Sequence, residues 1–297
     1  MNPIANDIAV PSIATPQRAL TGWIQLSILL ALTCLLYFHI FPALVSQWIH
    51  DPNYSHGFLV PLFAGWVVWK RREQIVAAPR LPHASGLLIV AFSMGVLCLG
   101  VLGAENFLAR TSFLFLLAGL IVYFFGWACF RAVLFPWAVL FLAVPIPVIL
   151  LNKIAFPLQF LASRLASGML AFLGVPVLRE GNVIHLPSLT LDVVEACSGL
   201  RSLVSLITLS VFYGYLFEPR PSRRIILILS SIPIAVFANG LRIMGSGLLG
   251  EYVSPTLAEG FFHTFSGWLI FVLSLLLLLS IRSVFGLADK ILGSRPA

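Results

Sequence analysis

Long apolar stretches separated by short polar segments dominate the sequence. A helix that crosses a membrane needs about 20 mainly apolar residues, and the pattern predicts about eight such spans. They lie near residues 20–43, 57–70, 85–103, 111–130, 132–150, 198–217, 225–245 and 262–281. The second is short, and its Trp66 and Trp69 favour a position at the membrane interface. We therefore expect an all-α polytopic membrane protein.

One segment between the fifth and sixth spans, residues 152–197, does not read as a simple crossing, and we expect it to form an insertion on the outer face. Its first part, residues 152–173, carries Lys153, Gln159 and Arg164 among apolar side chains. This pattern is typical of an amphipathic helix that lies on the bilayer surface. A buried span is the alternative, and it would break the topology derived below.

The second part of this insertion, Val175–Pro187, predicts a small β-hairpin. Gly181 and Asn182 stand at its centre as turn residues, with β-branched residues on both sides. Leu189–Val194 alternates between apolar and polar positions like a third strand. Because lipid cannot satisfy an open sheet edge, we expect these strands to lie in water or against protein.

The composition excludes a soluble globular domain. Of the 297 residues, 60% are hydrophobic and only 10% are charged, whereas soluble domains carry about 25% charged residues. The stretch beginning near Leu20 is too long for the core of a cleavable signal peptide and lacks a small-residue cleavage site, so we interpret it as a signal anchor. We expect a disordered cytoplasmic tail (1–19), an integral membrane domain (20–285) and a second cytoplasmic tail (286–297).

Lysine and arginine residues predict the orientation. With both termini in the cytoplasm, twelve of the 18 basic residues fall inside: Arg18, Lys70, Arg71, Arg72, Arg80, Arg131, Arg220, Arg223, Arg224, Arg282, Lys290 and Arg295. Six fall outside: Arg110, Lys153, Arg164, Arg179, Arg201 and Arg242. The positive-inside rule favours this orientation and explains the net charge of +7 without a nucleic-acid partner.

This topology brings one cysteine to the outer side, at the start of the sixth span. Cys197 has polar neighbours, while Cys34, Cys98 and Cys129 lie inside apolar spans and are interpreted as small hydrophobic residues. A helix N-terminus and contact with water both favour the thiolate. The alternative is that Cys197 is simply a small residue at a helix end.

A cysteine nucleophile needs a basic or cationic partner and a group that stabilises the oxyanion. His263 and Arg242 fall on the same outer side and are candidates for these roles. An interfacial histidine and an arginine that reaches the outer headgroups are the alternatives.

Four further residues near these positions are candidates for supporting or substrate-binding roles. Asn239 shares a helix face with Arg242, and Arg201 competes with Arg242 as the oxyanion donor because spacing alone cannot separate the two. Ser198 and Glu195 flank the thiol, and Glu195 would raise the pKa of the thiol if it were close.

A polar cluster before the second span, Asp51–Phe58, falls on the same side. It contains Tyr54 and His56, and we expect it to form a wall of the site or a substrate groove, with His56 as the alternative base to His263. An ordinary loop with a turn at Asp51 is the other interpretation.

Motifs for metals and cofactors are not found in the sequence. The six histidines never occur at HExxH spacing, and there is no Walker A loop, GxGxxG, paired CxxC or GxSxG elbow. We therefore expect no metal and no cofactor.

Four ordered motifs resemble the exosortase family (exosortase/archaeosortase superfamily) of polytopic membrane cysteine transpeptidases. They are Tyr54-Ser-His-Gly-Phe-Leu-Val-Pro with a later Trp-Lys-Arg-Arg, Glu195-Ala-Cys-Ser-Gly-Leu-Arg, Ala238-Asn-Gly-Leu-Arg-Ile, and Phe262-His263 with Gly267-Trp268. The resemblance runs from about residue 20 to residue 285. It implies that the family's three functional residues correspond to Cys197, Arg242 and His263.

The resemblance also implies a substrate class and a location. Family members act on secreted or surface proteins with a C-terminal tripartite sorting signal (PEP-CTERM): a short Pro-Glu-Pro box, one transmembrane helix and a basic cytoplasmic end. It implies cleavage through a thioester on the periplasmic side of the inner membrane, in bacteria that usually make exopolysaccharide. A transporter, or a non-enzymatic factor for exopolysaccharide export, is the alternative function.

Overall fold

The computed structural model describes residues 16–193, 199–254 and 261–291 and is mainly helical. The chain divides into two compact units, Met1–Ala43 and Leu44–Ala297. Helix α1 (Pro16–Leu36) belongs to the first unit, and helix α2 (Ile40–His50) runs across the boundary between them. The candidate site residues all belong to the second unit.

The first part of the second unit contains a tightly packed helical hairpin. Helices α5 (Ser85–Leu102) and α6 (Asn106–Phe125) approach so closely that a Cβ atom on Gly100 would lie 2.5 Å from the backbone nitrogen of Ala109. Small residues allow such close contact between membrane helices. Glu105 is the N-cap residue of α6, and its side chain accepts a hydrogen bond from the backbone nitrogen of Phe107 at 3.2 Å.

Short helical segments precede and follow this hairpin in the chain. They are the 3₁₀ helix η1 (Ser55–Phe58), α3 (Leu59–Lys70), α4 (Arg72–Ala77), α7 (Trp127–Val139) and the 3₁₀ helix η2 (Leu140–Ala143). Helix α7 packs against α3 and α6.

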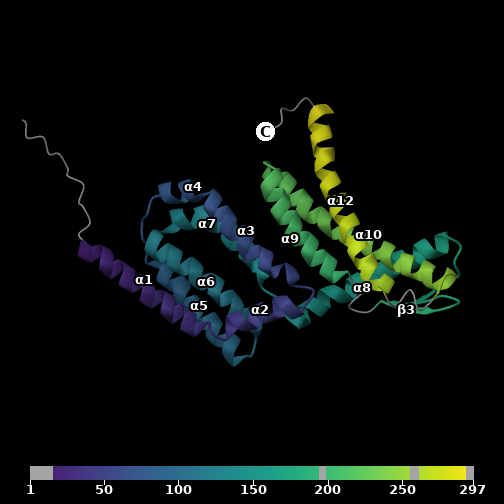
Figure 1. Cartoon of the computed structure of the whole chain (residues 1–297), viewed down its shortest axis with the longest axis horizontal. Helices are drawn as coiled ribbons and strands as arrows, with labels where there is room; N and C mark the ends of the chain where they lie inside the picture. The colour runs from purple at the N-terminus through teal and green to yellow at the C-terminus, as the bar shows by residue number, and fades with distance from the viewer. Residues whose placement is uncertain (1–15, 194–198, 255–260, 292–297) are drawn as a thin grey trace, which may run out of the picture. The chain divides into compact units, whose positions relative to one another are not determined.

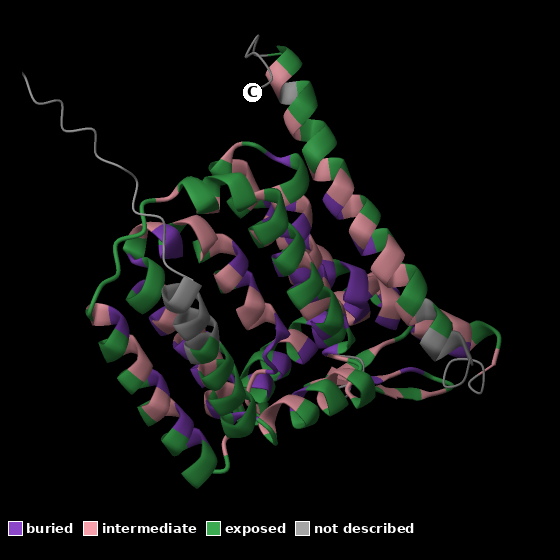
Figure 2. Ribbon diagram, turned by 60° about the vertical axis from the view of Figure 1, so that its left-hand side comes forward, coloured by how far each residue is buried: buried purple, intermediate pink, exposed green. Residues whose placement is uncertain are grey.

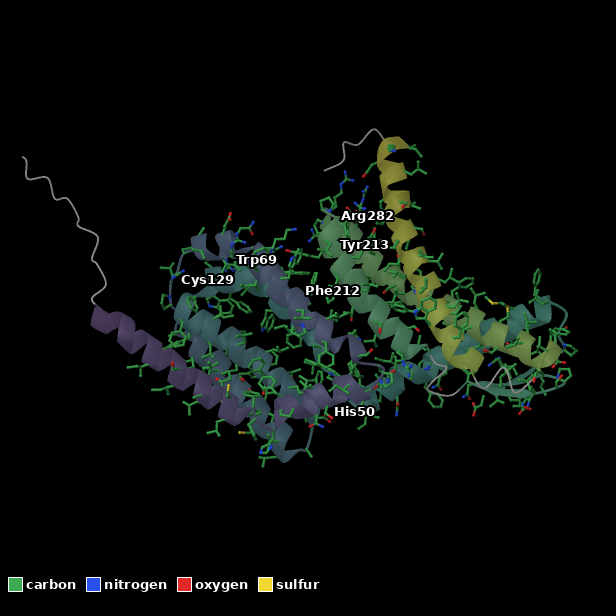
Figure 3. All side chains as sticks on the ribbon, in the orientation of Figure 1. His50, Trp69, Cys129, Phe212, Tyr213 and Arg282 are labelled. Atoms are coloured by element: carbon green, nitrogen blue, oxygen red, sulfur yellow. The ribbon has the colours of Figure 1, made fainter. Side chains whose placement is uncertain are left out.

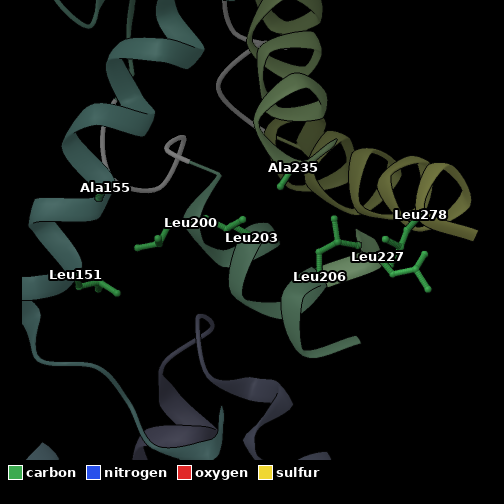
Figure 4. Close-up of a cluster of buried hydrophobic side chains, with 8 residues drawn as sticks. All are labelled: Leu151, Ala155, Leu200, Leu203, Leu206, Leu227, Ala235 and Leu278. Atoms are coloured by element: carbon green, nitrogen blue, oxygen red, sulfur yellow. The ribbon is translucent and has the colours of Figure 1, made fainter. Parts of the chain in front are cut away.

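The second part of the unit is built around one long helix. Helix α10 (Pro221–Tyr252) packs against α8 (Val148–Phe172), α9 (Leu200–Phe217) and α12 (Phe261–Ile291) (Figure 1). Their apolar core is a cluster of mainly leucine side chains that links these four helices (Figure 4): Leu151, Ala155, Leu200, Leu203, Leu206, Leu227, Ala235 and Leu278. This core fixes the relative positions of the helices that carry the candidate site.

Aromatic side chains join the two parts of the unit. Phe63 of α3 stacks on Phe212 of α9 with ring centroids 3.9 Å apart, and Figure 3 labels Phe212 on α9. Phe135 of α7 stacks on Tyr215 of α9 with centroids 4.4 Å apart. Because buried aromatic pairs stabilise beyond their buried area, these contacts hold α3 and α7 against α9.

The predicted hairpin is confirmed. Strands β1 (Leu178–Glu180), β2 (Val183–His185) and β3 (Thr190–Asp192) form an antiparallel sheet in that order. Gly181 makes the turn with φ +65°, a conformation that glycine adopts without steric cost. Ile184 is fully buried in a cluster with residues of α8 and α10, so the sheet lies against protein as expected.

Eight membrane spans are not confirmed. Six described helices are long and apolar enough to cross a membrane: α5, α6, α8, α9, α10 and the Gly267–Ile291 part of α12. Helices Ser27–Leu36 and Ile40–His50 would add a seventh if they form one broken span. The expected second span is a helix of only 12 residues, α3, and the expected fifth is divided among α7, η2 and α8, where Pro145 and Pro147 interrupt the apolar run.

Helix α8 contains most of the segment that was expected to lie on the bilayer surface. Its 25 residues meet the length and composition of a span. Its surface position therefore stays a prediction.

The outer faces of the helices are apolar, as a lipid environment requires. Figure 2 shows exposed positions along the helices. Large apolar side chains are exposed on α5, among them Leu88 (74% exposed) and Leu99 (65% exposed). Soluble monomers rarely expose apolar patches of this extent. The structure therefore agrees with a multi-pass membrane protein.

Candidate active site

A cavity of about 630 Å³ lies where η1, α9, α10 and α12 meet. His56, Arg201 and Arg242 give it polar walls, and Trp268 and Phe271 are among its apolar residues. Segments up to 219 residues apart, from Pro52 to Phe271, therefore share one space. Three of the residues predicted from the sequence to act together are found in its walls.

The cysteine motif reaches this cavity through Gly199. Cys197, Ser198 and Glu195 lie outside the described residues, but Gly199 stands only two positions after Cys197 and lines the cavity. Gly199 has φ +73°, which starts α9 in the left-handed conformation. A Cβ atom there would lie 2.8 Å from Cγ of Asn239. Asn239 is therefore packed directly against the glycine turn of the cysteine motif.

The chain that leads into the cysteine motif is also fixed to the fold at Val193. Val193 is buried, and its backbone nitrogen donates to the carbonyl of Asn182 at 3.1 Å. The side-chain amide of Asn182 donates to the carbonyl of Val193 at 3.2 Å. The hairpin thus holds the chain immediately before the cysteine motif, and Asn239 packs against Gly199 within the motif.

The arginine and histidine motifs meet through Gly267. Arg242 is half-buried, and its Cζ lies 3.7 Å from the position a Cβ atom would take on Gly267, which is ordinary van der Waals contact. His263 lies in the first turn of α12, and its side chain is outside the described part. Positions four apart share a helix face, so the backbone places position 263 on the face of Gly267.

Arg201 also lines the cavity, one turn into α9, but it is exposed to solvent. None of the described residues that line the cavity is an aspartate or glutamate. The two guanidinium groups that face the cavity, those of Arg201 and Arg242, are suited to bind a negative charge, whether permanent or developing during a reaction.

His56 lies in η1 and faces the cavity while being only 8% exposed. Burial lowers its pKa below the usual 6.5, because the charged ring loses hydration. The backbone of Leu142 opposes this shift weakly, without reaching hydrogen-bond geometry. At neutral pH the ring is therefore mainly uncharged.

Tyr54 has a different place from the one expected. It is 2% exposed and does not line the cavity; instead its hydroxyl accepts a hydrogen bond from the backbone nitrogen of Ile146 at 3.0 Å. Burial is the main cause that raises the pKa of Tyr54. Its contact connects the segment before η1 to the start of α8.

A family comparison agrees with this assembly of motifs. The family model described as transmembrane exosortase (Exosortase_EpsH) matches residues 48–280, which is most of the chain. The chain belongs to the transmembrane exosortase family. Every described residue that lines the cavity falls inside the matched range. Membership supports a membrane transpeptidase role in general.

Searches among curated proteins and among solved structures found no match. Within the described residues, no three His, Cys, Asp or Glu side chains come together as metal ligands.

Several cavity residues were not singled out from the sequence. On α9 they include Ser205, Thr208 and Phe212. With Arg201 they recur at intervals of four, three and four residues, which is the period of one helix face. The polar residues Arg201, Ser205 and Thr208 on one face of an apolar helix were the sequence signal that could have identified this wall of the cavity.

Gly199→Ala should destabilise the protein because the turn before α9 has no room for a methyl group. The left-handed conformation costs a non-glycine residue about 1–2 kcal/mol, and the clash with Asn239 adds roughly 1–3 kcal/mol. Gly174 is the matched control, since it has φ +82° with nothing within 4 Å of its Cβ position. Thermal unfolding of both variants in detergent measures the difference. Equal losses of stability would contradict the packing of Asn239 on Gly199.

Proposed function

We propose that the chain is a membrane-embedded cysteine transpeptidase that cleaves a C-terminal PEP-type sorting signal through a thioester. The observation that carries the proposal is the shared cavity, which Gly199, Arg242 and Gly267 line together. Each of these residues belongs to a different one of the four family motifs. A transporter path does not require these particular motifs to meet.

In the proposed reaction the Cys197 thiolate attacks the carbonyl carbon of the scissile peptide bond. The C–N bond then breaks, His263 protonates the leaving amine, and the acyl group stays on sulfur as a thioester. An amine, a hydroxyl group or water attacks the thioester and releases the thiolate. The contacts of Gly199 with Asn239 and of Gly267 with Arg242 support this arrangement.

Arg242 is the better candidate for the oxyanion donor. It is half-buried, whereas Arg201 is exposed. A donor acts more strongly on developing charge where water is excluded, because the local dielectric constant is lower. We assign Arg201 to the attraction of the acidic residue in the Pro-Glu-Pro box.

The proposed site faces the periplasm. Helix α9 carries Arg201 in its first turn and Tyr215 near its end, and its 18 residues span about 27 Å, close to the hydrocarbon thickness of roughly 30 Å. Arg71 donates to the Tyr215 hydroxyl at 2.8 Å, and Arg224 lies over the Tyr215 ring.

The two basic clusters used to predict the orientation therefore meet at the end of α9 opposite to Arg201. This supports a cytoplasmic position for Lys70–Arg72 and Arg220–Arg224.

Co-expression with a tailed reporter protein tests the proposal. The reporter should lose its transmembrane segment, and mass measurement of the product should place the new C-terminus next to the Pro-Glu-Pro box. A reporter whose tail has the box replaced by Pro-Gln-Pro is the control and should be processed more slowly. An unchanged reporter mass in cells that contain the folded protein would refute the proposed function.

A further inference from the structure

The turn that carries His56 is held rigidly by residues distant in sequence. A Cβ atom on Gly57 would lie 2.4 Å from the indole ring of Trp48, so the backbone is pressed against that ring. The indole nitrogen of Trp48 donates to the carbonyl of Ala143 at 2.8 Å. Together with the Tyr54–Ile146 hydrogen bond, these contacts fix η1 against the segment that joins α7 to α8.

His56 is the unusual member of this rigid turn. Both ring nitrogens are buried, and neither has a hydrogen-bond partner among the described residues. Buried polar atoms are normally paired, because an unpaired group loses the hydrogen bonds it had in water. The fold thus holds a histidine in a cavity wall where an apolar residue of the same size would cost less free energy.

A neutral imidazole has one N–H donor and one nitrogen acceptor. A peptide group offers the complementary pair, a carbonyl acceptor and an N–H donor. An isolated carboxylate offers acceptors alone, and the cavity already presents two guanidinium groups to such a charge. The chemistry of His56 therefore matches the backbone of a peptide better than it matches an acidic side chain.

We propose that His56 is a substrate-binding residue that hydrogen-bonds a peptide group beside the scissile bond and positions it in the cavity. This inference rests on the proposed function, because it takes the occupant of the cavity to be the sorting-signal peptide. It gives His56 a binding role and leaves proton transfer to another group.

Two substitutions separate binding from the other possible roles. His56→Gln keeps a donor and an acceptor, while His56→Leu removes both at similar volume. Binding of a peptide containing the Pro-Glu-Pro box is measured in the Cys197→Ala background, in which the peptide is not consumed. We expect His56→Leu to weaken binding on the order of tenfold, the usual effect of leaving a buried partner unpaired, and His56→Gln to stay within about threefold of the parent.

The same substitutions are measured for reporter cleavage in the protein that retains Cys197. His56→Leu should raise KM more than it lowers kcat, and His56→Gln should restore most of the activity. The thermal unfolding temperature of His56→Leu should equal or exceed that of the parent, because no described hydrogen bond is lost. His50 supplies a matched control: it is exposed near the end of α2, and His50→Gln should change neither binding nor cleavage.

Four results would overturn the inference: unchanged binding by His56→Leu, a lower unfolding temperature for it, an equal loss of kcat in both substitutions, or no peptide binding at all. Equal loss of kcat would assign proton transfer to His56. Failure of the proposed function is distinguished by reporter cleavage that persists in Cys197→Ala or is absent from the parent protein. Peptide binding that depends on His56 in a protein without cleavage activity would uphold the inference and refute the transpeptidase.

Discussion

Cys197→Ala leaves the tailed reporter at full length in the membrane, while the variant protein accumulates and unfolds at the parental temperature. Loss of the proposed nucleophile removes the sulfur atom that forms the thioester in the proposed reaction, and comparable substitutions in hydrolases lower kcat by roughly 10⁴–10⁶. Stability should be little affected, because the substitution removes a single sulfur atom and introduces no new group. Immunoblotting of the reporter and thermal unfolding of the purified protein measure the two effects.

Cys98→Ala is the matched control for this experiment. Cys98 is an exposed, free cysteine on α5, outside the cavity, so its removal should leave cleavage intact. Normal processing of the reporter by Cys197→Ala would exclude a cysteine mechanism. Loss of processing in both variants would point to damage that is unrelated to the proposed thioester.

Arg242→Ala should lower kcat by about 10²–10³, the effect of removing one oxyanion donor. Arg201→Ala should act mainly on KM and cost less, since the exposed guanidinium is screened by water and salt. The two variants are compared by steady-state cleavage of the reporter peptide at low and high ionic strength. Only the Arg201 effect should shrink as salt is added.

Arg242→Lys tests the geometry of the guanidinium group. Lysine keeps the charge but not the planar donor pair, and the guanidinium of Arg242 is seated on Gly267. We expect a loss close to that of Arg242→Ala. Full activity of Arg242→Lys, or a larger kcat effect at Arg201, would transfer the oxyanion role away from Arg242.

Local sequence patterns were sufficient for the regular elements of the second unit. Gly181 and Asn182 predicted the hairpin because turn chemistry acts over neighbouring residues, and Ile184 in its second strand is buried as the alternation requires. The apolar runs that became α5, α9 and α10 were long and uninterrupted enough to be found from composition alone.

The number of spans could not be obtained in this way, since hydropathy measures apolar length and not helix continuity. The run at residues 132–150 is apolar throughout, yet α7 ends at Val139 and α8 begins at Val148. Prolines at 145 and 147 lack the backbone N–H that a continuous helix needs. For α3, flanking apolar residues that belong to η1 extended the predicted span beyond the helix itself.

The meeting of Arg201, Arg242 and His56 in one space was predicted from topology, which assigns each motif to one side of the membrane. Topology could not predict which of them lie in the walls. Tyr54 lies outside the lining because its hydroxyl is bonded to Ile146, 92 residues away. Contacts between residues so far apart in sequence produce no periodic pattern that sequence analysis could detect. For the same reason, only the structure shows that the buried ring nitrogens of His56 have no hydrogen-bond partner among the described residues.

The wide spacing of the cavity walls along the chain has a consequence for biosynthesis. The lining begins at Pro52 and is completed by Phe271 on the last helix. A nascent chain that has inserted its cysteine and arginine motifs still lacks the wall of the cavity that α12 supplies. In the proposed transpeptidase, the reactive site can therefore form only after α12 has been synthesised, so the proposed nucleophile would not act before the cavity that selects its substrate is complete.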